Sequence, residues 1–442
     1  MKKIIAILGI FLLLFHFLFL WITTNIDGYF YWAIGHYFKT GIYPFVSPFI
    51  YARPTTISPP LYGAILSLIG SIPSGDILLH FIQLLLLATT TLLLYNILRT
   101  IISSNAAALI SFLFLIFPTN VIYTGSMMTE LLAQTLLTVY VYLIHKKHIG
   151  RAFLLACVMT LLKYQCIFLV IFTGIIAVKK IRTNIFPILL GILIIMLWVI
   201  TNHAITGIWG LSDAKNLPFY TNMVWEGKYY PPESDPSVIS LRKYVPATGD
   251  KYREYWDIQD YILPYTKRQW SAVTELLGNV GVAAIRTHPI GYLTNGMRVF
   301  IQTHAHRAPW FDNLQTFSAV DPVQPLYCGS LGTIQFCKPL MMTKFSYPFW
   351  NTYVKTSRAL YNLVVPPLLL FLFLPILVLT LFDSRTRIYA LVYLSSLLPI
   401  SYLSMVESRY LIPYYPLILI IAIHGIHSVY GYIQKKIIAY ES

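Results

Sequence analysis

Residues 364–382 read VVPPLLLFLFLPILVLTLF, a run of nineteen residues without a charged side chain. A run of this length supplies the roughly 20 residues that an α-helix needs to cross the hydrocarbon core of a bilayer. Similar runs recur through the 442 residues, of which 57% are hydrophobic and only 11% charged. Soluble domains contain about 25% charged residues. The sequence therefore predicts an all-α polytopic membrane protein.

The apolar runs predict about ten transmembrane helices, within a range of 9–12. They lie near 4–22, 77–97, 105–123, 127–144, 151–163, 165–178, 184–203, 360–382, 388–405 and 410–432. The first run exceeds the roughly 7–15 apolar residues of a signal peptide and is followed by no small-residue cleavage pattern, so it is interpreted as a membrane helix. The stretch 59–72 is also apolar, but prolines flank it, and we expect it to lie at the membrane interface.

The basic residues indicate the orientation of the chain. With the N-terminus in the cytoplasm, thirteen of the 32 Lys and Arg residues fall in the predicted inner loops and the tail, while the short outer connections hold few. This asymmetry follows the positive-inside rule and places both termini in the cytoplasm. The net charge of +15 thus reflects membrane topology and gives no argument for a nucleic-acid partner.

The acidic residues divide into two groups. Eleven of the 17 fall in one hydrophilic segment, residues 204–357. Asp27, Asp76, Glu130 and Glu407 all map to the outer membrane edge. A carboxylate close to hydrocarbon is costly and tends to mark function. We interpret Asp27 and Glu130 as functional candidates and Asp76 as a helix N-cap.

Three regions follow from this distribution. Residues 1–203 form an N-terminal membrane module with an outer first loop at 23–76, residues 204–357 an extracytoplasmic segment, and residues 358–442 the C-terminal membrane helices. The chain contains no N-x-S/T sequon, which favours a bacterial inner membrane with the hydrophilic segment in the periplasm. In an oxidising compartment, Cys328 and Cys337 could form a disulfide.

The outer edge carries several short stretches of unusual composition. The stretch DGYFYWAIGHYFKTG (27–41) is aromatic and suits a helix in the headgroup layer that stops at Gly41. Pro59 and Pro60 can start, but not continue, a helix. Further outer turns carry Lys163 and, at the start of the last span, Arg409, which could hold a lipid phosphate or simply snorkel to the interface.

The sequence lacks the common motifs for metal binding, nucleotide binding and serine-nucleophile catalysis. Neither a Cys/His metal spacing nor a phosphate-binding glycine loop occurs, and there is no G-x-S-x-G nucleophile motif. The histidines of THAHR (303–307) are expected to lie on the surface of a loop.

The order of the outer-edge motifs resembles the GT-C class of membrane glycosyltransferases, which use polyprenyl-phosphate-linked sugars. This class includes protein O-mannosyltransferases and lipid A aminoarabinose transferases. The resemblance covers residues 1–205 and 385–435. It rests on Asp27 before an aromatic stretch, on Pro-Pro-Leu-Tyr at 59–62, on Pro118 followed by Glu130, on Lys163 at the next outer turn, and on Arg409-Tyr410 with Pro413 and Pro416.

This resemblance implies a reaction and roles for individual residues. Asp27 would act as the catalytic base that takes a proton from an acceptor hydroxyl during a single, inverting displacement. Candidate ligands of the donor phosphate are Arg53, Lys163 and Arg409. The aromatic rings expected to pack against donor and acceptor are those of Tyr31, Tyr62 and Tyr410.

One departure from the family pattern affects the acids. Many relatives carry a second acid directly after the first, whereas this chain has Gly28. Glu130 is the candidate for a second catalytic acid, with or without a divalent cation (Mg²⁺ or Mn²⁺) held by Asp27 and Glu130; no cofactor is assigned.

The expected partners are a polyprenyl-phosphate-linked sugar and a lipid, glycan or protein acceptor in the cell envelope. Two other functions remain open. A surface-polysaccharide polymerase or ligase would share the outer site and a large loop. A lipid or solute transporter would instead carry charges at the membrane midplane or repeated halves, and neither pattern is found in the sequence.

Overall fold

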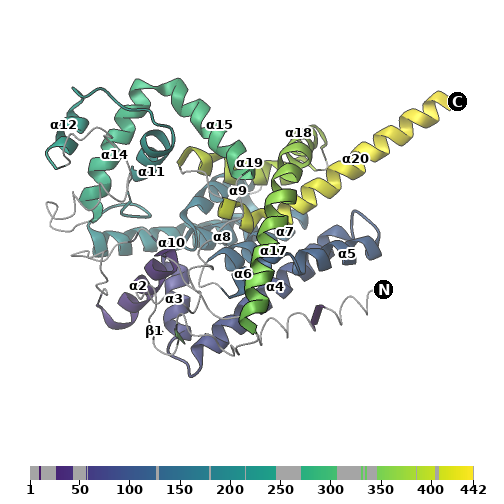
Figure 1. The fold of residues 1–442 in the computed structure, drawn as a ribbon, viewed down its shortest axis with the longest axis horizontal. Helices are drawn as coiled ribbons and strands as arrows, with labels where there is room; N and C mark the ends of the chain where they lie inside the picture. Colours follow the sequence, from purple (N-terminus) through teal and green to yellow (C-terminus); the bar gives the residue numbers. More distant parts are fainter. Residues whose placement is uncertain are drawn as a thin grey trace.

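A computed structural model describes residues 9–10, 26–42, 56, 58–125, 129–178, 181–214, 216–244, 270–305, 330–331, 334–335, 346–384, 386–403 and 408–441. This part of the chain is almost entirely helical, which confirms the predicted all-α class. One pair of two-residue strands is the exception, with β1 (Ser330–Leu331) antiparallel to β2 (Ile334–Gln335). In Figure 1, the last helix extends toward one end of the molecule, and the helices of the hydrophilic segment gather at the other.

The first outer loop folds as two helices in contact. Helix α2 (Ile26–Thr40) ends as predicted before Gly41, whose φ of +73° is in the left-handed region that favours glycine. Helix α3 (Pro60–Ile69) begins at the Pro-Pro pair, with Pro59 as its N-cap in extended conformation. Both expectations about the ends of these helices are therefore confirmed. The next helix is α4 (Gly75–Leu98), whose N-cap is Ser74 rather than Asp76.

The remaining helices of the N-terminal region follow the predicted runs with one clear difference. They are α5 (Ser104–Leu115), α6 (Pro118–Thr124), α7 (Glu130–His145), α8 (Ile149–Thr160), the 3₁₀ turn η1 (Tyr164–Cys166), α9 (Ile167–Val178) and α10 (Ile181–Thr206). The run 105–123 was expected as one helix, but it is divided between α5 and α6. The division comes directly before Pro118, which lacks the amide hydrogen needed to continue a helix.

Four described helical segments are long and apolar enough to cross a membrane. They are Ile77–Leu98, Asn184–Thr206, Thr356–Phe382 and Tyr410–Gln434. Six other apolar helices are shorter, at 10–17 residues, and the predicted run 4–22 lies almost entirely outside the described residues. The structure thus supports an integral membrane protein, while the count of ten spans stays a prediction.

The hydrophilic segment contains a helical unit with a core of its own. Its elements are α11 (Leu217–Tyr220), the π-helical turn η2 (Thr221–Glu226), α12 (Pro236–Arg242) and α14 (Trp270–Thr287). Val224, Leu241 and Leu277 are among the buried residues of this core, and Phe30 of α2 packs into it. The helix that carries Asp27 is therefore anchored to the hydrophilic segment as well as to α3.

The next helix of the segment, α15 (Pro289–Ala305), leaves this unit and packs against the C-terminal helices (Figure 1). His304 of α15 is buried, and its Nε2 lies 2.6 Å from the hydroxyl of Tyr393. The expectation of a surface histidine in a loop was wrong for His304, because the helix continues through it; His306 lies outside the described residues.

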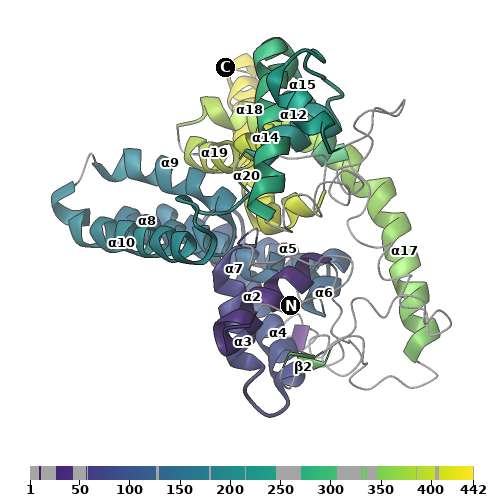
Figure 2. The same cartoon turned by 90° about the vertical axis from the view of Figure 1, so that its left-hand side faces the viewer.

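The C-terminal region completes the main apolar core. Its elements are α17 (Ser346–Pro367), the π-helical turn η4 (Leu368–Phe373), α18 (Leu374–Phe382), α19 (Arg387–Leu403), the 3₁₀ helix η5 (Ser408–Tyr414) and α20 (Tyr415–Glu441). Leu397 and Leu417 join Leu94 and Leu137 of the N-terminal helices in one buried cluster. In Figure 2, α2, α3 and α4 lie together at one end of the view, opposite α15 and α18.

Candidate functional site

The site begins where α2 crosses α3 at two glycines. A Cβ atom at Gly35 would collide with the carbonyl oxygen of Gly63, and one at Gly63 would lie 2.8 Å from the carbonyl oxygen of Tyr31. The two backbones can approach this closely only because both residues lack a side chain. The crossing brings Tyr31 and Tyr62 into edge-to-face contact, with ring centroids 5.4 Å apart.

The start of α3 is fixed to the turn that carries Lys163. The amide of Leu61 donates a hydrogen bond of 2.9 Å to the carbonyl oxygen of Leu161. The hydroxyl of Tyr164 donates to the carbonyl oxygen of Thr56 at 2.9 Å. Two motifs a hundred residues apart in the sequence, Pro-Pro-Leu-Tyr and Leu-Leu-Lys-Tyr, are therefore held side by side.

Lys163 pairs with Glu130 at this place. Lys163 Nζ lies 3.2 Å from Glu130 Oε1; the carboxylate side chain is 1% exposed and the lysine side chain 17%. Glu130 opens α7, where the N-terminal end of the helix dipole favours a negative charge. Among the described residues, the second oxygen, Oε2, is buried without a hydrogen-bond partner. A buried carboxylate oxygen without a donor is costly, so this atom could accept a hydrogen bond from a ligand.

Tyr62 connects this ion pair to the first loop. Burial raises the pKa of its hydroxyl, and the nearby charge of Glu130 adds to the effect, followed by Tyr31. The amide of Gln83 on α4 donates a long hydrogen bond of 3.4 Å to the same hydroxyl. Tyr62 is therefore a neutral, buried group that faces both the Glu130 carboxylate and the aromatic side of α2.

The late Arg-Tyr motif reaches the same region through α7. Gln134 Nε2 donates to the carbonyl oxygen of Ile412 in η5 at 2.7 Å and to Asn120 Oδ1 of α6 at 3.1 Å. A small cavity of about 20 Å³, lined by Lys163 and Tyr410 among others, separates the Lys163 turn from η5. This volume is enough for one water molecule.

The structure thus brings together Tyr31, Tyr62, Glu130, Lys163 and Tyr410, which the sequence analysis selected from five separate motifs. It also gives Lys163 a partner that the sequence did not predict, since Lys163 was expected to serve the donor phosphate alone.

Other predicted residues are placed only in part or not at all. Asp27 lies in the first turn of α2, one helical turn before Tyr31, and Arg409 lies in η5; of both, only the backbone is described. Arg53, Cys328 and Cys337 fall outside the described residues.

Sequence reasoning missed a buried polar cluster that joins the first loop to the hydrophilic segment. Asp213 is 2% exposed and accepts a hydrogen bond of 3.1 Å from the amide of Thr56. The hydroxyl of Thr56 donates to Asn202 Oδ1 at 2.5 Å, and Thr274 donates to the carbonyl oxygen of Asp213 at 2.8 Å. Asp213 was counted with the other acids of the hydrophilic segment, although it follows the predicted span 184–203 closely enough to lie at the outer edge.

The amides Gln83 and Gln134 were missed as well. Each stands in an otherwise apolar run, FIQLLLL and LLAQTLL. A polar side chain within a membrane helix is a signal for an internal partner.

The described residues include no group of three or more His, Cys, Asp or Glu side chains that could hold a metal ion. What this arrangement offers is a cation, the Lys163 ammonium, fixed by a buried carboxylate next to a Tyr hydroxyl and an aromatic helix. An ammonium has three donors, so Lys163 can bind an anion while it stays paired with Glu130.

Comparisons with protein-family models, with curated proteins and with solved structures find no match to this chain.

Proposed function

We propose that this chain is an integral-membrane glycosyltransferase that moves a sugar from a polyprenyl-phosphate donor to an acceptor hydroxyl at the extracytoplasmic face. The observation that carries the proposal is the Glu130–Lys163 ion pair, held 3.2 Å apart beneath the contact of α2 with α3. A fixed cation next to an aromatic surface suits a ligand with a phosphate head and a prenyl tail. Five outer-edge motifs contribute to this place, as expected for a single site.

In the proposed reaction, Asp27 takes the proton of the acceptor hydroxyl as that oxygen forms a bond with the anomeric carbon. The bond from the anomeric carbon to the phosphate oxygen breaks, and polyprenyl phosphate leaves with the electron pair. A single displacement inverts the anomeric centre. Polyprenyl phosphate is already a good leaving group, so the site needs cations around it rather than a strong general acid.

Lys163 is the proposed contact of the leaving phosphate, and Glu130 holds its ammonium group in place. Arg53 and Arg409 are the further candidates for this phosphate. Tyr31, Tyr62 and Tyr410 supply the aromatic surface for donor and acceptor. Because the positive-inside rule puts the Lys163 turn outside, the proposed location of the reaction is the periplasmic face of a bacterial inner membrane.

The test is sugar transfer in membranes from a radiolabelled pool of polyprenyl-phosphate sugars, with wild type compared with Asp27→Asn at matched expression. A matched control is Asp76→Asn, which removes another outer-edge acid from the first turn of α4. We expect transfer to be lost in Asp27→Asn and retained in Asp76→Asn. Equal transfer in all three proteins would refute the assignment of Asp27. Absence of transfer from wild type with every sugar tested would favour a transporter.

The polymerase or ligase alternative is weakened at one point. Such an enzyme would be expected to use basic residues of the hydrophilic segment, where THAHR (303–307) is a candidate stretch. Since His304 is buried against Tyr393, it is not available to a glycan in solution.

A further inference from the structure

Helix α15 descends alongside α19, although it belongs to a segment that the sequence assigns to the aqueous phase. Near its middle, Gly296 lies directly against the ring of Tyr402, close to the outer end of α19. Near its end, His304 is bonded to Tyr393, in the middle of α19. Nine residues of α19 separate these two levels, which corresponds to roughly 14 Å along a helix. That depth is about half of a bilayer's hydrocarbon core.

The buried side of this part of α15 belongs to the membrane core. Phe300 is part of the large apolar cluster formed by the membrane helices. The ring of His304 stacks on Phe373 of η4, with centroids 6.1 Å apart. Both contacts tie the C-terminal half of α15 to segments that the sequence places in the bilayer.

Helix α15 also exposes an apolar stripe, formed by Ile290, Leu293, Met297 and Ile301. These positions follow helical spacing and share one face. A surface hollow of about 630 Å³ runs along this face, lined by Leu293, Met297, Ile301 and Tyr402 together with the polar residues Thr294, Arg298 and Gln302. A continuous apolar stripe of this kind is unusual on a helix that faces water and indicates an interaction surface.

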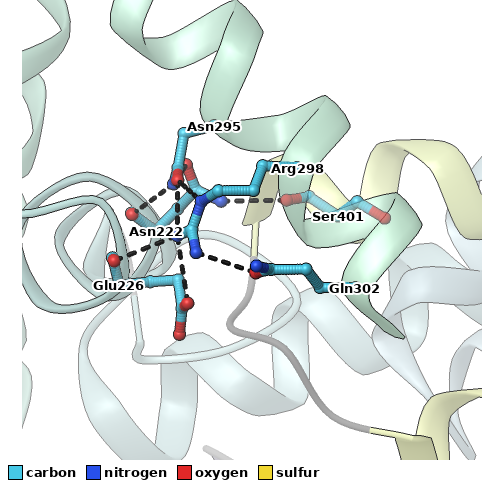
Figure 3. Close-up of polar contacts among 6 residues, drawn as sticks. All are labelled: Asn222, Glu226, Asn295, Arg298, Gln302 and Ser401. Atoms are coloured by element: carbon cyan, nitrogen blue, oxygen red, sulfur yellow. Dashed lines mark hydrogen bonds and ion pairs between the residues drawn. The ribbon is translucent and has the colours of Figure 1, made fainter. Parts of the chain in front are cut away.

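The polar residues of this part of α15 have partners within the protein. Arg298 pairs with Glu226 at 3.0 Å and also donates to Asn295 and to Gln302 (Figure 3). Asn222 donates to the carbonyl oxygen of Ser401 at 2.8 Å and accepts from Asn295 (Figure 3). The network neutralises the one charged residue of α15 and fixes the helix to the outer end of α19.

We propose that the C-terminal half of α15 inserts into the outer leaflet, and that acyl chains of bilayer lipids cover its apolar stripe. Bilayer lipid is the expected occupant because the stripe lies near a predicted membrane span. Helix α15 packs against η4. The span 356–382, which contains η4, exposes the apolar side chains of Leu363, Leu368 and Phe371. Lipid that surrounds this span would therefore lie next to α15. The chain therefore contains one more membrane-inserted helix than its hydropathy indicates.

The experiment places a bimane fluorophore on single cysteines, in a background with the four native cysteines replaced by alanine, reconstituted in phosphatidylcholine vesicles. Met297→Cys and Ile301→Cys report on the stripe. Ile239→Cys on α12 is the matched control, because Ile239 is 49% exposed and Met297 and Ile301 are each 45% exposed. Two quenchers are compared: phosphatidylcholine with brominated acyl chains, and iodide in the aqueous phase.

We expect brominated lipid to quench positions 297 and 301 at least twice as strongly as position 239, and iodide to show the reverse order. Quenching of 297 and 301 by iodide alone would overturn the proposal in favour of a stripe in water. Protection from both quenchers would overturn it in favour of a protein partner, either a second copy or another segment of this chain. A single symmetric peak in size-exclusion chromatography is required of each labelled protein. Where a variant fails this requirement, Leu293→Cys replaces it on the same stripe.

Discussion

Gly35 lies against the carbonyl oxygen of Gly63, so the two helices of the first loop touch through their backbones. This contact determines where Tyr62 meets Tyr31, and through Tyr62 it connects the helix of Asp27 to the Glu130–Lys163 pair. The aromatic first loop is thus positioned by residues without side chains.

Replacement of Gly63 by alanine is expected to force α2 away from α3, because the added methyl group would meet Ile34 and the carbonyl oxygen of Tyr31. Overpacking of this kind costs about 1–3 kcal/mol of unfolding free energy. The measurement is unfolding by sodium dodecyl sulfate in mixed micelles, together with sugar transfer, which we expect to fall. Gly431→Ala is the matched control, since nothing lies within 4 Å of a Cβ atom there. An equal effect of both substitutions would contradict the role of the crossing.

Glu130→Gln is expected to lower the free energy of unfolding by about 3 kcal/mol. This value is at the lower end of the range for breaking a buried ion pair, because the Lys163 ammonium keeps access to water. Lys163→Met should cost a similar amount, since it leaves the Glu130 carboxylate buried without a counter-charge. In the double variant the losses should not add, which gives a coupling energy of about 1–3 kcal/mol. Additive losses in the mixed-micelle assay would show that the two side chains do not interact.

Gln134→Leu is expected to leave the carbonyl oxygen of Ile412 and the amide oxygen of Asn120 without their donor. A buried polar group left without its partner costs about 1–3 kcal/mol. Because η5 also carries Tyr410, transfer should decrease through an altered KM for the donor. Thr91→Val serves as control: its hydroxyl donates only within its own helix, to the carbonyl oxygen of Leu87. A loss of stability with an unchanged KM would mean that Gln134 does not position η5.

A disulfide between Cys328 and Cys337 is a prediction from the sequence, because both cysteines lie in the segment that is expected to face an oxidising compartment. Alkylation of the denatured protein should modify two thiols without reductant and four with it. Modification of all four cysteines without reductant would exclude the bond.

The N-cap of α12 should be sensitive to acid. Hydrogen bonds from the hydroxyl and amide of Ser237 lower the pKa of Asp235 below its ordinary value. Its stabilising contribution is therefore present above about pH 4 and is lost as the pH falls through the lowered pKa. Asp235→Ala should increase the rate of amide hydrogen exchange at residues 237–242 at pH 7. The increase should correspond to a loss of about 1 kcal/mol in the free energy of helix opening. The difference between wild type and variant should shrink in samples incubated below pH 3; a constant difference would contradict the assignment.

The sequence predicts the helices well where one residue type determines an end. Pro59-Pro60 starts α3 and Gly41 follows the end of α2, because their backbone restrictions act locally. Pro118 divides a predicted span for the same local reason, although the hydropathy of that run gave no indication of the break.

The partners within the site could not be predicted, because they depend on tertiary packing. Lys163 and Glu130 are 33 residues apart, and only the approach of α7 to the turn after α8 makes them a pair. The placement of α15 escaped hydropathy for a related reason. Arg298 and Gln302 lower its mean hydropathy, yet their polar groups are satisfied by neighbours that the sequence does not reveal.

The bond from Gln134 to Ile412 joins residues 278 positions apart, and this has a consequence for the assembly of the protein during translation. At roughly 5–20 residues per second, the ribosome needs about 15–60 s to synthesise the intervening chain. Throughout that interval the Gln134 amide of the newly inserted α7 can bond to Asn120, but its acceptor in η5 does not yet exist. The nascent N-terminal helices therefore wait in an incomplete state, and a chain that terminates before η5 is expected to be recognised and degraded by membrane quality control.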